Sequence, residues 1–373
     1  MNTTPAFPDL CSGGHVLGEQ RGDVAVITLN RPGALNALSL PMVRDLTSLL
    51  LHFGESPGVQ AVVMQGAGRE GKPPAFCAGG DIRFFHQAAL AGDPRLEDFF
   101  TEEYALNHLI HHYPKPIVAL MDGICMGGGM GISQGSRSRV VTELSKLAMP
   151  ETHIGLFPDV GGGWFMSRCP GHLGEYLALT GVTLGAADAL ACGWADQFIP
   201  AAKLPALVEA LTGQPHASAE AVLATVLAWA EPAGEGGLAD QRAAIDLHFS
   251  LPSVSAIEAS LKADPSAFAQ ATLAILHKRS PLMMAVTLRQ VRLARSMSLA
   301  DALRMERDLV RHAFHLRPGT ASETIEGIRA LVIDKDHQPR WNPSHISDVT
   351  DAQVDAYFNS PWPAAVHPLR ALD

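Results

Sequence analysis

Two carboxylates stand in surroundings that suit a catalytic acid, base or nucleophile. Glu151 follows a proline and precedes an apolar loop, and Asp159 follows another proline and precedes glycines 161–163. Neither has a basic neighbour in the sequence. Burial without a cation raises the pKa of a carboxyl group toward working pH, which suits proton transfer or nucleophilic attack. The structural alternative for Asp159 is the N-cap of a helix that begins near Gly161.

A run of three glycines, residues 127–129, supplies a second chemical feature. The apolar segment Ile117–Met121 before it and the small residues of Met130–Ser133 after it predict a strand, a tight turn and a helix start. Backbone N–H groups at such a turn suit a carbonyl oxygen that gains negative charge. A turn without any ligand is the alternative. Residues 76–83, with the sequence FCAGGDIR, are a second place where bare backbone precedes a helix.

Several other motifs are weaker indications of function. Gly131–Gly135 matches the G-x-S-x-G pattern of hydrolases, but the glycine turn precedes it, so Ser133 is expected inside a helix and not on a nucleophile elbow. The glycine runs match neither the dinucleotide nor the P-loop pattern. Three histidines within residues 108–112 could share a helix face, yet no ligands of another type accompany them. No metal site is therefore expected.

Composition narrows the class of protein. The chain has 373 residues, 47% hydrophobic and 18% charged, which is typical of a globular enzyme. A net charge of −10 argues against a nucleic-acid partner. The five cysteines contain no C-x-x-C pair and fit a reducing compartment. No apolar run is long enough to span a bilayer and the first residues lack a basic targeting region, so we expect no membrane contact and a cytoplasmic location.

The predicted elements divide the chain into two regions. Strands are expected at Val24–Leu29 and Ala61–Met64, and a helix is expected from Ser39. Prolines break the alanine-rich sequence after residue 200 into successive helices without a strand signal. We therefore predict an α/β core domain over residues 16–200 and a helical region over 201–373 that packs on it. Apolar faces of those helices could pack instead on another subunit, which leaves a homo-oligomer open.

Four motifs, in this order, together resemble the crotonase or enoyl-CoA hydratase/isomerase superfamily. They span residues 30–38, 76–82, 123–129 and 150–155. The segments 149–163 and 326–343 resemble more narrowly the branch that hydrolyses 3-hydroxyisobutyryl-CoA. The resemblance implies an α/β fold, a crotonase-like spiral of repeated ββα units with an appended C-terminal helical region.

The resemblance also implies site residues. The oxyanion hole would consist of the backbone N–H groups of Gly80 and Gly128, in the two places where exposed donors are expected. Contacts with the acyl-CoA substrate would come from Leu35, Ala37, Ala78, Asp81 and Ile82 and, in the hydrolase branch, from Glu103. Coenzyme A is part of the substrate, and no other cofactor is expected.

One departure from the hydratase pattern indicates the reaction. Hydratases of this superfamily carry a glutamate two residues after the glycine triplet, where this chain has Gly131. They usually have glycine where this chain has Asp159. The resemblance therefore implies hydrolysis of a short 3-hydroxyacyl-CoA thioester, first 3-hydroxyisobutyryl-CoA in valine catabolism and second 3-hydroxypropionyl-CoA. Glu151 would attack the thioester or activate water, and Asp159 would accept a hydrogen bond from the 3-hydroxyl.

Two other functions compete with this hypothesis. The same scaffold would permit an enoyl-CoA hydratase or isomerase that acts on a short acyl-CoA. A non-enzymatic acyl-CoA-binding protein is the second alternative, against which the pair Glu151 and Asp159 argues.

Overall fold

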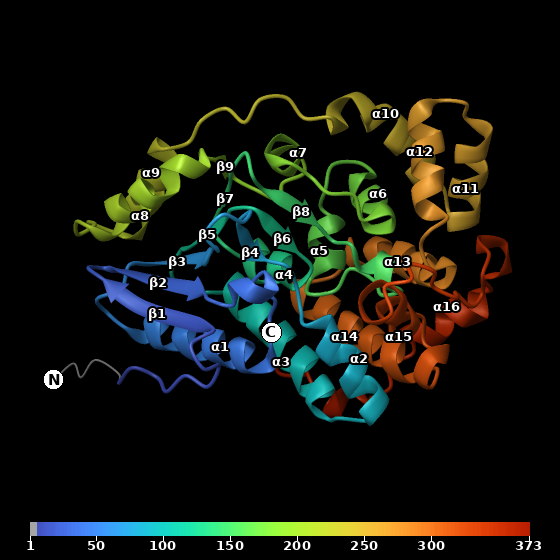
Figure 1. The fold of residues 1–373 in the computed structure, drawn as a ribbon, viewed down its shortest axis with the longest axis horizontal. Coiled ribbons are helices and arrows are strands. Elements are labelled where there is room, and N and C mark those ends of the chain that lie inside the picture. The colour runs from blue at the N-terminus through green and yellow to red at the C-terminus, as the bar shows by residue number, and fades with distance from the viewer. Residues whose placement is uncertain (1–5) are drawn as a thin grey trace. The chain divides into compact units, whose positions relative to one another are not determined.

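Short strands alternate with helices in the computed structural model, which describes residues 6–373 (Figure 1). The strands are β1 (Val16–Arg21), β2 (Val24–Leu29), β3 (Ala61–Gly66), β4 (Ala75–Cys77), β5 (Ile117–Met121), β6 (Ile124–Met126), β7 (Ser138–Val141), β8 (Lys146–Ala148) and β9 (Gln197–Phe198).

The helices become more frequent toward the C-terminus. They are α1 (Leu40–Glu55), α2 (Ile82–Ala91), α3 (Arg95–His111), α4 (Gly128–Gln134), α5 (Gly162–Met166), α6 (Leu173–Thr180), α7 (Ala186–Ala191), α8 (Leu204–Thr212), α9 (Ala219–Ala228), α10 (Leu238–Phe249), α11 (Val254–Ala263), α12 (Ala267–Leu276), α13 (Pro281–Ala294), α14 (Leu299–His315), α15 (Glu323–Ile328) and α16 (Asp351–Phe358).

The chain folds into two compact units and passes between them more than once. The first unit contains the residues up to Gly80 together with Ala105–Leu147 and Thr183–Gly236. The second unit contains Asp81–Tyr104, Ala148–Val182 and Gly237–Asp373. The division at residue 200 expected from the sequence follows the order of the chain and stays a prediction.

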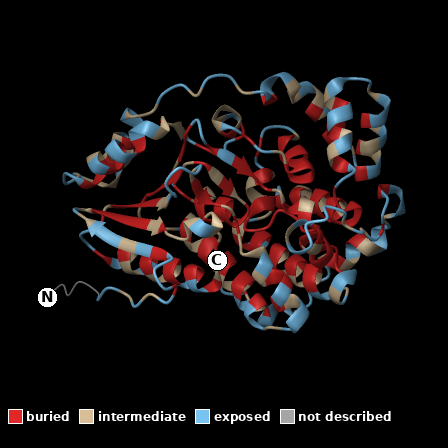
Figure 2. Cartoon of the chain, in the orientation of Figure 1, coloured by how far each residue is buried: buried red, intermediate tan, exposed pale blue. Residues whose placement is uncertain are grey.

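A mostly parallel sheet forms the centre of the first unit. Its strand order is β1-β2-β3-β5-β7-β9, with only β1 and β2 antiparallel. The valines of β2 and β3 and Ile27 of β2 are buried, as expected for parallel strands covered on both faces (Figure 2). Apolar residues of α8 and α9, among them Leu207, Leu211, Val222 and Val226, complete the core on this sheet.

A second, three-stranded sheet positions the glycine turn. Its order is β4-β6-β8, and β4 and β6 are parallel. The turn at Gly127, with a φ of 49°, leads from β6 directly into α4. A Cβ atom at Gly129 would lie 2.2 Å from the carbonyl oxygen of Cys77, so only glycine lets α4 approach β4 this closely.

Helices of the second unit pack on one another through small and apolar residues. The buried helix α13 contacts both α5 and α6, and α15 contacts the 3₁₀-helix Glu151–Ile154. Serine side chains cap many of these helices, for example Ser280 before α13 and Ser298 before α14. The C-terminal helices therefore fix the loops that follow β8.

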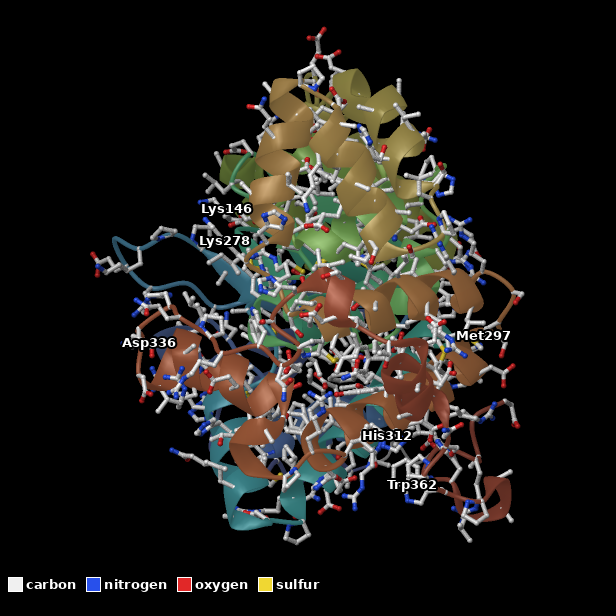
Figure 3. All side chains as sticks on the ribbon, turned by 90° about the vertical axis from the view of Figure 1, so that its right-hand side faces the viewer. Lys146, Lys278, Met297, His312, Asp336 and Trp362 are labelled. Atoms are coloured by element: carbon white, nitrogen blue, oxygen red, sulfur yellow. The ribbon has the colours of Figure 1, made fainter. Side chains whose placement is uncertain are left out.

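Glu97 joins two of these helices through a group of ion pairs. The carboxylate lies on α3 and binds Arg307, Arg311 (2.7 Å) and His315 (2.8 Å), all on α14. These partners lower the pKa of Glu97 to about 2 although burial opposes the shift. Trp362, labelled in Figure 3, lies 4.8 Å from the Arg307 guanidinium and covers it. The second unit thus carries a network of charges between α3 and α14.

The sequence predicted many of these elements correctly. The strand at Val24–Leu29 is β2, and Ser39 is the N-cap of α1. The helical character after residue 200 is confirmed. Strands β1 and β7 were not predicted from the sequence, and β9 consists of two residues. None of the helices among residues 6–373 is long and apolar enough to cross a membrane.

Asn36 stabilises the turn that follows β2 in the first unit, and its substitution tests this role. The side chain is fully buried, accepts a hydrogen bond from the Arg31 N–H (2.9 Å) and donates to the carbonyls of Ala67 (3.1 Å) and Ala75 (2.8 Å). Its φ of 58° also suits asparagine better than alanine. We expect Asn36→Ala to lower the free energy of unfolding by about 2–3 kcal/mol, because buried polar groups lose their partners. Denaturant unfolding measures this loss.

Asn30→Ala is the control for that measurement. Asn30 makes one exposed side-chain hydrogen bond, to the Gly14 carbonyl (2.9 Å), so its loss should cost less than about 1 kcal/mol. Equal effects of the two substitutions would contradict the role given to Asn36.

Candidate functional site

Four buried carboxyl groups in the second unit influence one another, and we call them the acid cluster. Glu103 lies on α3, Glu151 begins the 3₁₀-helix, Asp159 lies in the loop before α5, and Glu306 lies on α14. Their exposed fractions are 2%, 6%, 6% and 0%. The structure therefore brings together three of the acids that the sequence singled out and adds a fourth.

Glu151 is held in a tight loop and keeps a free oxygen. Gly155 closes the 3₁₀-helix in a left-handed conformation, and its N–H donates to the Glu151 carbonyl. The Glu151 Oε2 atom is buried without a hydrogen-bond partner among the described residues. Burial and the charge of Asp159 raise the pKa of Glu151 well above its usual range. A carboxyl group with these properties can take a proton or attack an electrophile.

Asp159 has one polar partner in the cluster. The Tyr104 hydroxyl donates a hydrogen bond of 2.8 Å to Asp159 Oδ2. Burial raises the pKa of Asp159 to about 6, and the Tyr104 hydrogen bond opposes that shift. The N-cap alternative for Asp159 is wrong, because Gly161 is the N-cap of α5 and no side chain caps it.

Glu103 faces the same group from α3. Burial and the charges of Asp159 and Glu151 raise its pKa well above the usual range. Its Oε1 atom is buried and lacks a hydrogen-bond partner among the described residues. Glu103 can therefore remain protonated at neutral pH, as a donor toward an oxygen.

The acid cluster contains no neutralising cation. Among residues 6–373, no ion pair joins Glu103, Glu151, Asp159 or Glu306 to a lysine, arginine or histidine. Like charges so close together cannot all ionise, and their pKa values separate. This arrangement can hold an acid and a base side by side.

Sequence reasoning missed Glu306. The residue lies in the C-terminal helical sequence, far along the chain from the other acids. One signal was available, because Glu306 shares the buried face of α14 with Leu303, Leu309 and Val310. A carboxylate at helical spacing among apolar residues indicates either a structural hydrogen-bond network or a functional site.

The two predicted oxyanion turns lie side by side in the first unit. Gly128 is the first residue of α4, where a helix leaves N–H groups without internal partners. A Cβ atom at Gly79, which precedes Gly80, would lie 3.5 Å from the Gly128 nitrogen. The backbone at the two turns is therefore adjacent, and its role as a shared donor site stays a prediction.

The residues predicted to contact the substrate belong to both units. In the first unit, the Ala78 N–H donates to the Leu35 carbonyl (3.0 Å), so that the turn containing Leu35 and Ala37 contacts the strand end at Ala78. Leu35 has a φ of 53°. In the second unit, Asp81 caps α2 by accepting a hydrogen bond from the Phe84 N–H (3.3 Å), and Ile82 begins that helix. Their role in binding stays a prediction.

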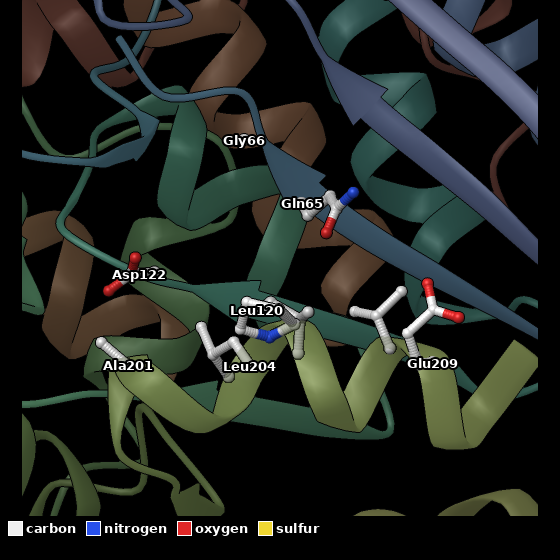
Figure 4. Close-up of a pocket in the computed structure, with 9 residues that line it drawn as sticks. Gln65, Gly66, Leu120, Asp122, Ala201, Leu204 and Glu209 are labelled. Atoms are coloured by element: carbon white, nitrogen blue, oxygen red, sulfur yellow. The ribbon is translucent and has the colours of Figure 1, made fainter. Parts of the chain in front are cut away.

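Two surface cavities do not include these residues. One, of about 390 Å³, lies in the first unit between strand ends and α8, with Asp122 and Glu209 among its lining residues (Figure 4). Another of about 390 Å³ lies in the second unit beside Arg307, Arg311 and Trp362. Neither contains a residue that the sequence predicted for the site.

Possible metal-binding groups were sought among the residues that the structure describes. Over residues 6–373 no group of at least three histidine, cysteine, aspartate or glutamate side chains is arranged to hold a metal ion. His108 and His112 stack with ring centroids 4.1 Å apart, and His112 Nδ1 lies 3.0 Å from the His108 carbonyl.

The sequence is similar to proteins of known family. The family pattern described as Enoyl-CoA hydratase/isomerase matches residues 24–358. A relative from Xenopus tropicalis, "3-hydroxyisobutyryl-CoA hydrolase, mitochondrial", is 44% identical over 93% of this chain and 89% of its own length. The protein of the same name from Rattus norvegicus is 42% identical over 92% of this chain and 89% of its own.

A solved structure shares the fold. A carnitinyl-CoA dehydratase from Mycobacterium thermoresistibile superimposes with a TM-score of 0.84 and is 36% identical, covering 96% of this chain and 99% of its own. The α/β architecture expected from the sequence resemblance, with its helical C-terminal part, is confirmed.

Removal of the Tyr104 hydroxyl tests the electrostatics of the acid cluster. Its hydrogen bond lowers the pKa of Asp159, so Tyr104→Phe should raise that pKa from about 6 by about one unit. Carbon-13 NMR of aspartate-labelled protein measures the titration, with Asp159→Asn to assign the signal.

Tyr113→Phe serves as the matched control. The Tyr113 hydroxyl donates to the Leu50 carbonyl (2.6 Å) within the first unit, so its loss should leave the Asp159 titration unchanged. An unchanged or lowered Asp159 pKa in Tyr104→Phe would show that this hydrogen bond does not stabilise the carboxylate.

Proposed function

Because this chain belongs to the enoyl-CoA hydratase/isomerase family, we propose that it hydrolyses the thioester of a short 3-hydroxyacyl-CoA. We assign 3-hydroxyisobutyryl-CoA as the first substrate and 3-hydroxypropionyl-CoA as the second. The observation that carries the proposal is the pair Glu151 and Asp159, buried together without a cation. The frog and rat relatives, named as 3-hydroxyisobutyryl-CoA hydrolases, support the choice of substrate.

Glu151 performs the bond cleavage in this proposal. Its carboxylate attacks the thioester carbon, the CoA thiolate leaves, and water then hydrolyses the mixed anhydride. In the other route, Glu151 takes a proton from water, the resulting hydroxide attacks the same carbon, and the CoA thiolate leaves as the carbon–sulfur bond breaks. Both routes need an ionised Glu151, whose raised pKa makes the carboxylate a stronger base.

Backbone donors stabilise the negative charge that develops on the thioester oxygen. We assign this role to the N–H groups of Gly80 and Gly128. Each donor of this kind contributes about 3 kcal/mol to lowering the barrier. The adjacency of the two turns in the first unit supports the assignment.

Asp159 and Glu103 select and orient the acyl group. Asp159 accepts a hydrogen bond from the substrate 3-hydroxyl, while Tyr104 fixes the other carboxylate oxygen. Protonated Glu103 contacts the substrate as a donor. Leu35, Ala37, Ala78, Asp81 and Ile82 bind the rest of the acyl-CoA.

Hydration or isomerisation of an enoyl-CoA is the alternative function. The dehydratase name of the Mycobacterium protein favours it. Gly131, buried inside α4, argues against it, because this position lacks the second carboxylate of the hydratases. Crotonyl-CoA discriminates between the two, since hydration removes the absorbance of its conjugated double bond without releasing thiol.

Partners and location stay proposals. The substrate is an acyl-CoA, and neither a nucleic acid, a metal nor a further cofactor enters the proposed reaction. The cytoplasmic location expected from the sequence has no support from the frog and rat proteins, which are named mitochondrial. A homo-oligomer stays open.

Replacement of Glu151 tests the proposed reaction. Glu151→Gln should lower the rate of thiol release from 3-hydroxyisobutyryl-CoA by about 10²- to 10⁴-fold, because the amide can neither attack nor accept a proton. A thiol-reactive dye follows CoA release, and circular dichroism checks the fold.

Glu323→Gln is the control for this experiment. Glu323 is also a buried carboxyl of the second unit, but it accepts hydrogen bonds from Ser280 and the Asn342 N–H. This variant should keep most of the activity. Turnover by Glu151→Gln at the wild-type rate would remove Glu151 from the mechanism.

A pair of substrates tests the role of Asp159. Wild type should prefer 3-hydroxyisobutyryl-CoA over isobutyryl-CoA in kcat/KM by about 10²-fold or more, because a buried carboxylate without the hydroxyl loses its partner. Asp159→Ala should reduce that preference at least about tenfold. Equal losses of kcat/KM for both substrates would mean that Asp159 does not recognise the hydroxyl.

A further inference from the structure

Two side chains from the C-terminal helices hold the loop that carries Asp159. Gln290 on α13 donates from Nε2 to the Pro158 carbonyl (2.6 Å) and to Glu306 Oε1 (3.0 Å). Glu306 on α14 then accepts hydrogen bonds from the Gly161 N–H (2.7 Å) and the Gly163 N–H (3.0 Å). The contacts of Gln290 and Glu306 therefore lie on both sides of Asp159 in the chain.

The turn between these contacts has an unusual backbone. Val160 has a φ of 55° and Gly161 a φ of 85°, both in the left-handed region. A β-branched residue such as Val160 rarely adopts this conformation, which persists only where surrounding contacts fix it. The Glu306 carboxylate supplies such contacts, one oxygen to each glycine N–H. A Cβ atom at Gly163 would lie 2.9 Å from Gln290 Nε2 and 3.1 Å from Glu306 Oε1, so the fit is close.

Glu306 also contributes charge to the acid cluster. The titratable groups that face it are Asp159, Glu151 and Tyr104, and none is a cation. Arg307, the next residue, binds Glu97 and Thr101 instead. Burial raises the pKa of Glu306 to about 8, whereas the N–H groups of Gly161 and Gly163 lower it. The charge of Glu306 in turn raises the pKa of Glu151.

We propose that Glu306, supported by Gln290, is a positioning residue. It fixes the Asp159 turn and, when ionised, supplies a negative charge that acts on Glu151. The inference rests on the proposed function, since Asp159 and Glu151 are the groups through which Glu306 acts. Glu306 itself needs no contact with the substrate. Its carboxylate does two things at once: it binds the turn through two N–H groups, and it makes Glu151 more basic.

The sign of the electrostatic effect follows from the charges. Glu306 carries its negative charge where the pH exceeds its pKa of about 8. In that range, removal of the charge in Glu306→Gln lowers the pKa of Glu151, so Glu151 ionises at lower pH. The acidic limb of the kcat profile should therefore move to lower pH in Glu306→Gln, by about one unit. The new amide also puts N–H donors where an oxygen accepted hydrogen bonds, which loosens the turn. Its kcat should fall about 10- to 100-fold from misplacement of Asp159, with KM changed about threefold or less.

Glu306→Asp and Glu323→Gln complete the set of variants. Glu306→Asp keeps the charge but shortens the side chain, so kcat falls while the acidic limb stays near its wild-type position. Glu323→Gln removes a buried carboxyl elsewhere in the second unit and should leave the limb unmoved. A merely structural role for Glu306 would lower stability in Glu306→Gln without moving the limb.

A second readout does not depend on turnover. Carbon-13 NMR of glutamate-labelled protein, with Glu151→Gln to assign the signal, gives the pKa of Glu151 directly. That pKa should be lower in Glu306→Gln than in wild type and unchanged in Glu323→Gln. If wild type releases no thiol from any 3-hydroxyacyl-CoA, the proposed function fails, and the NMR titration alone decides the charge effect of Glu306. A Glu151 titration that is the same in Glu306→Gln as in wild type overturns the inference, as does an unmoved acidic limb in an active enzyme.

Discussion

The free-energy cost of burying four carboxyl groups, without an ion pair among residues 6–373, constrains the structure of the second unit. Glu103, Glu151, Asp159 and Glu306 are at most 6% exposed, and an isolated charge is unfavourable in such surroundings. The protein offsets part of this cost with neutral donors, the Tyr104 hydroxyl at Asp159 and glycine N–H groups at Glu306. Glu151 and Glu103 each keep an oxygen without a hydrogen-bond partner among residues 6–373. The proposed reaction assigns both of these acids to the substrate, whereas Glu306, which accepts several hydrogen bonds, is assigned to the loop.

The C-terminal helices do more than cover a core. Gln290 and Glu306 reach the loop that carries Asp159, and Thr324 on α15 donates to the Gly155 carbonyl (2.7 Å) at the end of the loop that carries Glu151. Both proposed catalytic loops thus depend on residues more than a hundred positions later in the chain. In a scaffold shared by enzymes of several reactions, such contacts are one way to give the same fold a different chemistry.

Local signals in the sequence sufficed for much of the fold and for the main acids. Periodicity located β2 and α1, and the isolation of Glu151 and Asp159 from basic residues identified them as candidates. Strand β7 was missed because it is short and because its stability comes from pairing with strands far away in the sequence. Tyr104 and Glu306 could not be assigned, since their importance arises from contacts across 55 and 145 residues of chain. The oxyanion and substrate-contact residues rest on motif resemblance, and their roles stay predictions.

The ion pairs of Glu97 join the two helices that carry Glu103 and Glu306. Glu97 on α3 attracts Arg307, Arg311 and His315 on α14. Arg311 and His315 are about one-third exposed, so dissolved ions can screen their part of this attraction. The buried acids are screened far less. Ionic strength therefore acts on the packing of the two helices that carry Glu103 and Glu306 through an attraction at the surface, although both of these carboxyls are buried.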